Sequence, residues 1–179
     1  MSALKYISKF GSPTRSVLEN SIETKVLLRD EIKLLNSYLE LESLRFDNVF
    51  EYKINVSEDL DTNTTEIPFM AIQPFIENAI IHGLNNKKEG DKKLLISFKK
   101  KGDVIVCFIE DNGIGRIASR KLNNTLKKKK KSRGIEIIEK RLKLIGKPYP
   151  QKGVIEIIDK YDDNNNSTGT RVSIKIGPS

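Results

Sequence analysis

Residues 104–109 are apolar at every position, and this run most constrains what the chain can fold into. An uninterrupted run of this length, rich in β-branched residues, is typical of a strand buried on both faces. It follows the turn sequence Lys101-Gly102-Asp103, and before that turn Leu94, Ile96 and Phe98 recur at every second position. We therefore predict an antiparallel hairpin whose second strand lies buried inside a sheet.

Helical and strand patterns elsewhere complete the fold. Apolar residues recur at three- and four-residue spacing from about Leu27 to Leu44, which predicts an amphipathic helix ending near Arg45-Phe46. Pro74 is expected to start a second helix, because proline suits a first helical turn and disrupts a helix interior. The other expected elements are a weaker helical pattern in residues 2–20, a half-buried strand 50–56, helices 75–84 and 134–145, strands 154–158 and 170–176, and polar connections 59–65, 85–91, 110–116, 116–133 and 162–169.

After residue 48 the predicted order is strand, helix, two strands, helix, two strands. Mostly antiparallel strands mixed with helices in this way form two layers, with helices covering one face of a single sheet. The fold class predicted is therefore α+β, a two-layer α/β sandwich with an N-terminal helical segment.

Composition limits the class of protein. The chain has 179 residues, of which 37% are hydrophobic, enough for one domain with a core and a helical appendage. A disulfide-stapled mini-protein, a collagen-like repeat and a wholly disordered tail are excluded. The single cysteine, Cys107, lies in the apolar run and is expected to be a reduced, buried thiol. No apolar stretch is long enough to span a bilayer, so we expect a cytoplasmic domain. The abrupt start of the sequence in a helical pattern is compatible with a part of a membrane-anchored protein.

The positive charge is concentrated rather than spread. Lysine and arginine number 32 against 24 acidic residues, a formal net charge of +8, and lysine fills residues 127–131 and 99–101. Such runs are most often solvated loops, then sites for polyanions such as nucleotide phosphates, and then duplex-binding patches. No aromatic residue interleaves with the run at 127–131, which argues against stacking on single strands.

The first candidate site is the segment Glu77-Asn78-Ala79-Ile80-Ile81-His82-Gly83. Asn78 and His82 are four residues apart and share one face of the predicted helix. A carboxamide oxygen suits Mg²⁺ that keeps most of its waters and a substrate phosphate. Glu77 is a candidate to orient that shell or to accept a proton. The alternative is a set of polar residues at a helix end.

The second candidate site follows the buried strand directly and reads Glu110-Asp111-Asn112-Gly113-Ile114-Gly115. A carboxylate at a strand end can accept a hydrogen bond from an exocyclic amine such as that of adenine. Gly113 and Gly115 allow positive φ and a close approach of backbone to ligand. The alternative is an ordinary turn.

Two further features concern phosphate and base. Gly134 opens the last predicted helix, and backbone N–H groups at a helix N-terminus bind phosphate. The five lysines just upstream would add attraction for a polyphosphate. Thr170 begins the last predicted strand after Gly169, where its hydroxyl could touch a base or a bridging water.

The order of these features resembles the GHKL (Bergerat) ATP-binding fold and, within it, the LytS/YehU-type sensor histidine kinases. The resemblance covers nearly the whole chain. Its signature residues are Leu28, Glu31, Tyr38-Leu39, Glu42, Arg45-Phe46, Pro68, Gln73-Pro74-Phe75, Glu77-Asn78-Ala79, His82-Gly83, Asp111-Asn112-Gly113-Ile114-Gly115 and Lys140-Arg141-Leu142.

The resemblance implies a role for each matched residue. Asn78 matches the Mg²⁺ ligand, Asp111 the residue that reads adenine, and Thr170 the threonine near the adenine. The other nucleotide-binding residues implied are His82, Asn112, Gly113, Gly115 and Gly134. Residues 116–133 correspond to the ATP lid. Of the glycines usual before the last helix, only Gly134 remains.

The resemblance also divides the chain and implies a function. Residues 1–46 would be the end of a dimerisation region, and residues 47–179 the ATP-binding catalytic domain. The phosphoacceptor histidine is absent, because the only histidine, His82, belongs to the nucleotide site. The implied activity is Mg-ATP-dependent phosphoryl transfer to a histidine outside this chain, so the fragment alone is not expected to autophosphorylate.

The implied partners are ATP, Mg²⁺, a response regulator and a second copy of the full-length kinase. The resemblance implies contact with the membrane only through a missing N-terminal part. It implies no binding of nucleic acid. Two alternatives remain open at this stage. One is a degenerate ATP-sensing module with a conformational output, which the thinned glycine pattern favours. The other is a nucleic-acid-binding protein driven by the lysines at 127–131.

Overall fold

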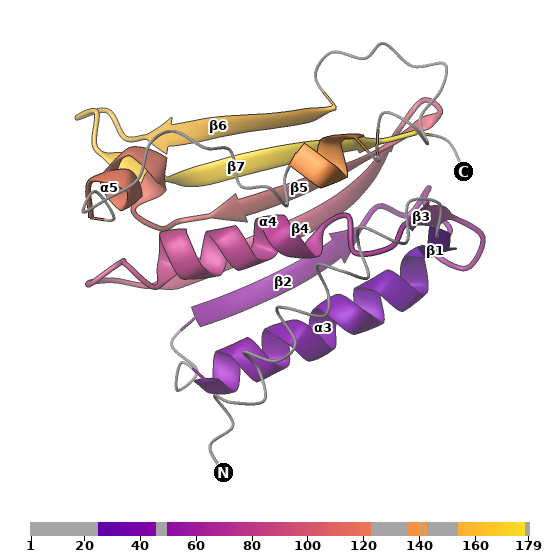
Figure 1. Cartoon of the computed structure of the whole chain (residues 1–179), viewed down its shortest axis with the longest axis horizontal. Helices are drawn as coiled ribbons and strands as arrows, with labels where there is room; N and C mark the ends of the chain where they lie inside the picture. Colours follow the sequence, from indigo (N-terminus) through magenta and orange to yellow (C-terminus); the bar gives the residue numbers. More distant parts are fainter. Residues whose placement is uncertain (1–24, 46–49, 123–135, 141, 143–153, 178–179) are drawn as a thin grey trace.

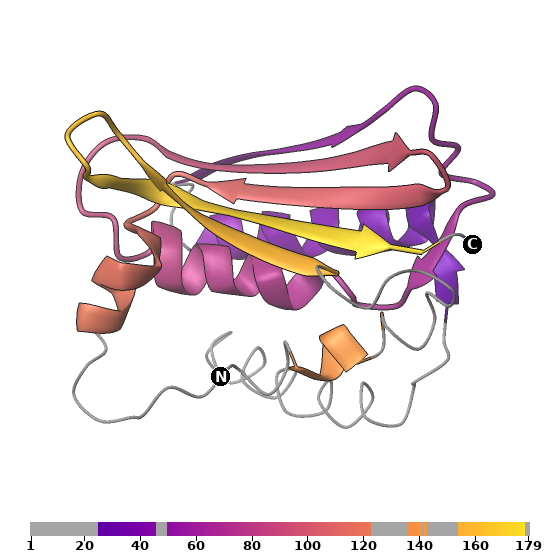
Figure 2. The same cartoon turned by 90° about the horizontal axis from the view of Figure 1, so that it is seen from above.

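The computed structural model describes residues 25–45, 50–122, 136–140, 142 and 154–177. Five strands form one sheet in the order β2-β4-β5-β7-β6. Helices α3 and α4 lie on one face of that sheet and leave the other face open (Figures 1 and 2). The strand bounds are β2 Phe50–Val56, β4 Lys92–Lys101, β5 Val104–Asp111, β6 Ile155–Tyr161 and β7 Ser167–Ile176. The predicted α+β fold with two layers is confirmed.

The predicted hairpin is β4 and β5, and it forms the middle of the sheet. All neighbouring strands run antiparallel except β2 and β4, which are parallel. Toward the helices, Ile105, Cys107 and Ile109 are buried, whereas on the open face Val106 is buried and Val104 and Phe108 are half-buried. The predicted burial of β5 on both faces therefore holds fully on the helix side and in part on the open face, which α3 and α4 do not cover.

Cys107 is a free, buried cysteine, as predicted. Burial and, to a smaller extent, the negative charge of Glu31 raise the pKa of its thiol. A thiol kept protonated in this way is a poor nucleophile. The reading of Cys107 as a core residue is confirmed.

Helix α3 (Leu28–Arg45) matches the predicted amphipathic helix. Leu28, Leu35 and Leu39 are fully buried and belong to the same core cluster as the sheet. Packing thus explains the apolar stripe of this helix. Leu41 and Leu44, at its far end, are exposed. The domain boundary at residue 46 stays a prediction.

The Pro74 helix begins one residue earlier than predicted and changes type along its length. Helix α4 (Gln73–Asn78) continues into a π-helix, η1 (Ala79–Leu84), where for example the Asn85 N–H donates to the Ile80 carbonyl at 2.9 Å. Bonds between residues five apart are rare and often mark functional sites. Apolar spacing in the sequence does not distinguish such a turn from a regular one.

Other differences lie in short segments. Strands β1 (Lys25–Leu27) and β3 (Glu66–Pro68) form a small second sheet that no periodicity indicates, since three residues show no period. The segment 116–133 was predicted as a polar loop, yet its first part belongs to helix α5 (Gly115–Leu122). The connection between β6 and β7 shortens to residues 162–166, because the Asp162 carboxylate accepts bonds from the Asn164 and Asn166 N–H groups.

Part of the last predicted helix is visible. Residues 136–140 and 142 are helical, and Ile138 and Leu142 are buried as the spacing predicted. The predicted helix in residues 2–20, Gly134 and the lysines at 127–131 lie outside the described residues. Among the helices that are described, none has the length and apolar character needed to cross a bilayer.

Candidate functional site

The candidate site begins where the backbones of η1 and the loop after β5 meet. A Cβ placed on Gly113 would lie 2.3 Å from the carbonyl carbon of Gly83 and 2.6 Å from its Cα. The Ile114 N–H also donates to the Gly83 carbonyl oxygen at 3.4 Å. No side chain fits between the two segments, so glycine is required at this contact.

Asp111 ends β5 beside this contact and is only 5% exposed. Its Oδ1 accepts a hydrogen bond from the Gly113 N–H at 2.8 Å, and a Cβ on Gly83 would lie 2.8 Å from the same oxygen. Burial raises the pKa of this carboxyl to about 6, against the lowering effect of the Gly113 N–H and of Lys160. At neutral pH Asp111 is therefore a mostly ionised acceptor in a buried position.

Strand β7 supplies the other wall of this region. Thr170 is the cross-strand neighbour of Asp111, and both residues are buried on the helix side of the sheet. Gly169 has φ +122°, and a Cβ there would lie 2.0 Å from the Asp111 carbonyl oxygen. The conformation and the close approach both require glycine. Thr170 and Gly169 were predicted site residues, but their contact with Asp111 is visible only in the structure.

Asn112 and Gly115, the other two predicted residues of this loop, make contacts that hold the loop in place. The Asn112 Oδ1 accepts from the Lys93 N–H at 2.7 Å, and its Nδ2 donates to the Asp91 carbonyl at 2.9 Å. The Asn112 carboxamide therefore fixes the loop to the start of β4. Gly115 has φ +73°, and a Cβ there would collide with the Ser167 side chain.

Asn78 and Glu77 lie at the end of α4, and both are half-buried. Within the described part of the chain, the Asn78 carboxamide makes no hydrogen bond, so its oxygen is available to a ligand. The Glu77 Oε1 accepts from the Gln73 Nε2 at 3.1 Å. Burial, and then the charge of Glu42, raise the Glu77 pKa, and the charge of Glu77 in turn helps to raise that of Tyr38. Glu77 is thus electrostatically coupled to α3.

His82 is exposed on η1, directly before Gly83. Its main-chain carbonyl accepts from the Asn86 Nδ2 at 3.1 Å. Among the predicted site residues, the structure therefore gathers Asp111, Gly113, Gly115 and Thr170 around one strand end. Asn78 and Glu77 belong to the adjoining helix.

An ion pair that no sequence pattern predicted lies next to this group. Asp159 of β6 is the cross-strand neighbour of Thr170, so Asp111, Thr170 and Asp159 form one row across three strands. The Asp159 carboxylate accepts from the Arg116 guanidinium of α5 at 2.7 and 2.8 Å. This fork-like pair ties the first turn of α5 to the sheet. Only the three-dimensional structure reveals this pair, because its partners are 43 positions apart in sequence.

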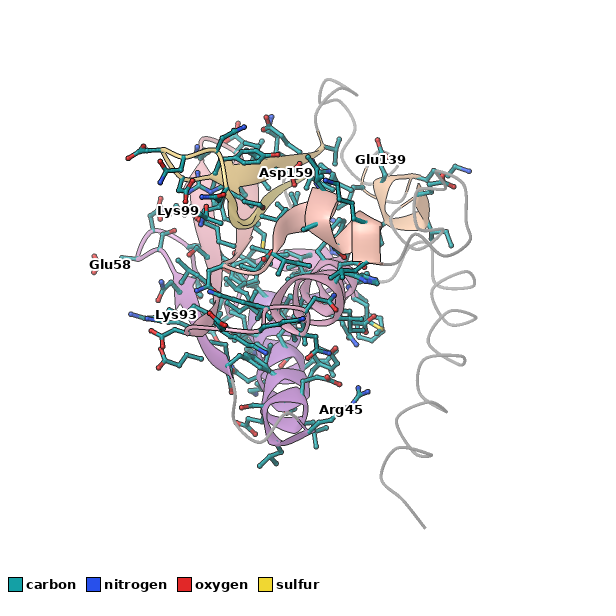
Figure 3. The ribbon with its side chains drawn as sticks, turned by 90° about the vertical axis from the view of Figure 1, so that its left-hand side faces the viewer. Arg45, Glu58, Lys93, Lys99, Glu139 and Asp159 are labelled. Atoms are coloured by element: carbon teal, nitrogen blue, oxygen red, sulfur yellow. The ribbon has the colours of Figure 1, made fainter. Side chains whose placement is uncertain are left out.

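The open face of the sheet has a different electrostatic character. Lys93 and Lys99, labelled in Figure 3, point away from the helices. Glu110 lies on this face between Lys160 (3.4 Å) and Arg171 (2.9 Å). Burial acts to raise the Glu110 pKa, but these two cations together hold it below its usual range. Glu110 thus forms ion pairs on the face of the sheet opposite the Asp111 side chain.

Comparison with known proteins gives a consistent result. The model of the histidine kinase family matches residues 1–50. The protein YwpD of Bacillus subtilis is 33% identical over 115 residues, which is 64% of this chain and 40% of YwpD. Sensor histidine kinase/phosphatase LytS of Staphylococcus aureus is 34% identical over 101 residues, which is 56% of this chain and 17% of LytS. The chain thus spans less than half the length of these relatives.

Solved structures agree on the fold. Histidine kinase AdeS of Acinetobacter baumannii aligns with a TM-score of 0.55 at 16% identity, covering 97% of this chain and 79% of AdeS. The catalytic domain of histidine kinase ThkA aligns with a TM-score of 0.53 at 14% identity, covering 86% of this chain and 94% of that domain. Identities this low indicate a shared fold, with no statement about function.

Proposed function

We propose that this chain, which is similar to LytS-type sensor histidine kinases and has the fold of histidine kinase catalytic domains, binds Mg-ATP and supplies the γ-phosphoryl group to a histidine outside this chain. The observation that carries this proposal is the buried Asp111 carboxylate, which lies against the backbone of Gly83 and accepts a hydrogen bond from the Gly113 N–H. Such a preformed acceptor suits a ligand that offers a donor at a fixed position.

Adenine fits the chemistry of this end of the site. Its exocyclic amine is a donor, and ionised Asp111 is an acceptor with one oxygen already engaged by the Gly113 N–H. Thr170, next to Asp111 in the sheet, adds a hydroxyl that can both donate and accept. Guanine carries a carbonyl where adenine carries this amine, and it would face the Asp111 carboxylate with a second acceptor. We therefore propose selectivity for ATP over GTP.

Asn78 is proposed to hold Mg²⁺. The donor chemistry fits, because a carboxamide oxygen is a hard, neutral ligand and protein-bound Mg²⁺ usually has few protein ligands. In the described residues no group of three or more His, Cys, Asp or Glu side chains is placed to hold a metal. When bound, Mg²⁺ would neutralise charge on the phosphates. Gly134 remains our proposed phosphate contact, and His82 and Asn112 stay proposed neighbours of the nucleotide.

For Glu77 we propose an orienting role rather than proton transfer. Its carboxylate is engaged by Gln73 on its own helix and is coupled to charges on α3. The bond spans one turn of α4 and can therefore steady the end of the helix that carries Asn78. This makes Glu77 a positioning residue for the metal ligand.

Transfer itself requires partners. The acceptor histidine would lie outside this chain, and the γ-phosphoryl would pass to its imidazole nitrogen with ADP as leaving group. Catalysis would consist largely of positioning and neutralisation of charge. We propose a response regulator as the next acceptor, a homodimer as the full-length state, and a membrane anchor outside this chain.

The test is titration calorimetry of the chain with Mg-ATP, with Mg-GTP, and with ATP in the presence of a chelator. We expect saturable binding of Mg-ATP, weaker binding without Mg²⁺ and little binding of Mg-GTP. Equal affinity for both nucleotides would contradict the adenine assignment, and no binding of either would contradict the proposal as a whole.

A second assay separates a kinase from an ATP sensor. The chain is incubated with radiolabelled Mg-ATP and a separate acceptor-helix fragment that carries the histidine of a full-length relative. Transfer of label supports the kinase. Binding of ATP without transfer would indicate a sensing module.

A further inference from the structure

Glu31 is a carboxylate inside the core that the proposed chemistry does not use. It lies in the first turns of α3 and is 1% exposed. Its Oε2 accepts a hydrogen bond from the backbone N–H of Met70 at 3.2 Å. Partners 39 positions apart in sequence are joined by this buried bond. Burial of a carboxylate is costly, so the contact that it makes calls for an explanation.

The partner residue is in an unusual conformation. Met70 has φ +54°, which is sterically disfavoured for a residue with a Cβ. The Ala71 N–H donates to the Pro68 carbonyl at 3.2 Å, so Met70 is the third residue of a tight turn, the position that takes positive φ in type II turns. That bond leaves the Met70 N–H unused. Because Met70 is buried, this N–H requires an acceptor from elsewhere, and Glu31 provides it.

The turn leads directly into the helix that carries Asn78. Ala71 and Ile72 are buried, and the Ile72 carbonyl accepts from the N–H groups of Phe75 and Ile76 at 3.0 and 3.4 Å. No side chain caps the start of α4. The place where α4 starts therefore depends on the turn that precedes it.

The first turn of α3, which carries Glu31, is held in place by main-chain hydrogen bonds. The Leu28 N–H donates to the Thr65 carbonyl at 2.8 Å, and the Arg29 N–H donates to the Thr62 carbonyl at 3.0 Å. Strands β1 and β3 pair immediately alongside. The first turn of α3 and the segment that leads to Met70 thus form one unit, from which Glu31 reaches the turn.

We infer that Glu31 is a positioning residue, which holds the Met70 turn in its positive-φ form and thereby fixes the start of α4 and the place of Asn78 relative to Asp111. The part of this inference that concerns ligand rests on the proposed function. The part that concerns α4 does not, and it can be measured without nucleotide.

The experiment compares Glu31→Ala, which removes the acceptor, with Glu31→Gln, which keeps one. Glu40→Ala, an exposed site on the same helix, is the matched control. Each variant is measured well below its melting temperature, by hydrogen exchange of residues 74–84 without nucleotide and by titration with Mg-ATP. For Glu31→Ala we expect about tenfold faster exchange in residues 74–84 and about tenfold weaker Mg-ATP binding, from the loss of one buried hydrogen bond. Glu31→Gln and Glu40→Ala should stay within about twofold of the parent.

A fourth variant tests whether Glu31 acts on α4 through the Met70 turn. Glycine adopts positive φ freely, so adding Met70→Gly to Glu31→Ala should slow the exchange of residues 74–84 again, even though a buried side chain is lost. The inference is overturned if folded Glu31→Ala exchanges like the parent in residues 74–84, or if Glu31→Gln is as impaired as Glu31→Ala. If the parent binds no Mg-ATP, the proposed function fails, while the exchange data still decide the role of Glu31.

Discussion

The two ends of the candidate site are built differently. At the end of β5, Asp111 is enclosed by the backbones of Gly83, Gly113 and Gly169, with approaches too close for any Cβ. At the end of α4, Asn78 is half-buried, and within the described structure its carboxamide makes no hydrogen bond. The base end is therefore held by close main-chain contacts, whereas the Asn78 carboxamide at the metal end is available to solvent or to a ligand. Specificity should reside in the first, and dependence on Mg²⁺ in the second.

The largest expected effect is on the backbone contact. Gly113→Ala places a Cβ against the backbone of Gly83, and we expect a loss of about 3 kcal/mol of stability or more. Gly102→Ala is the control, because Gly102 also has positive φ (+60°) but has nothing within 4 Å of the added Cβ. Its cost should be about 1 kcal/mol. Urea denaturation compares the two, and equal losses would show that the contact at Gly113 can relax.

The second prediction is that one substitution at Asp111 weakens nucleotide binding and at the same time raises the stability of the free protein. Asp111→Asn keeps an oxygen for the Gly113 N–H but places a donor where adenine also has one, so Mg-ATP affinity should fall about 100-fold. Without nucleotide the variant should be more stable at pH 7.5. Raising the Asp111 pKa from 3.8 to about 6 costs the folded protein on the order of 3 kcal/mol, which a neutral side chain avoids.

The pH dependence of this difference is specific. Between pH 3.8 and about 6 the folded parent holds the Asp111 proton more tightly than the unfolded chain does, so this group lowers stability as the pH rises through that range. The advantage of Asp111→Asn should therefore be absent near pH 3.5, grow up to about pH 6 and stay constant above it. Urea titrations of both proteins across this range measure it. A difference that does not change with pH would contradict the raised pKa.

The third prediction concerns the metal end. Asn78→Ala should weaken ATP binding about tenfold when Mg²⁺ is present and leave binding in chelator unchanged, because only the metal contact is lost. Its stability should stay within about 0.5 kcal/mol of the parent, since the side chain makes no internal hydrogen bond in the described structure. Calorimetry with and without Mg²⁺ gives both values. An equal loss in chelator would remove Asn78 from the metal site.

The smallest effect is expected at His82. Its side chain is exposed, so His82→Ala should change Mg-ATP affinity less than about threefold. A larger loss in the same calorimetric assay would mean that His82 turns toward the nucleotide when it binds. It would then belong with Asn78 at the end of the site that the ligand completes.

Local patterns were enough to predict the elements that carry the site. The β4–β5 hairpin, helix α3 and the position of Asp111 at a strand end follow from apolar spacing and from glycine-rich turns. The π-helical turn at η1 and the pair Arg116–Asp159 could not be predicted, because both depend on packing between distant segments. The Glu31–Met70 bond is of the same kind, since nothing in the sequence near Met70 indicates positive φ.

The crossing of Gly83 and Gly113 has a consequence for how such a domain can diverge. The main chains of Gly83 and Gly113 touch there, and neither residue has a side chain. Substitution of side chains therefore cannot adjust the geometry of this contact. A change in base selectivity must instead come from substitutions at Asp111 or Thr170, the residues proposed to face the base. Gly83 and Gly113 would be retained in such a variant.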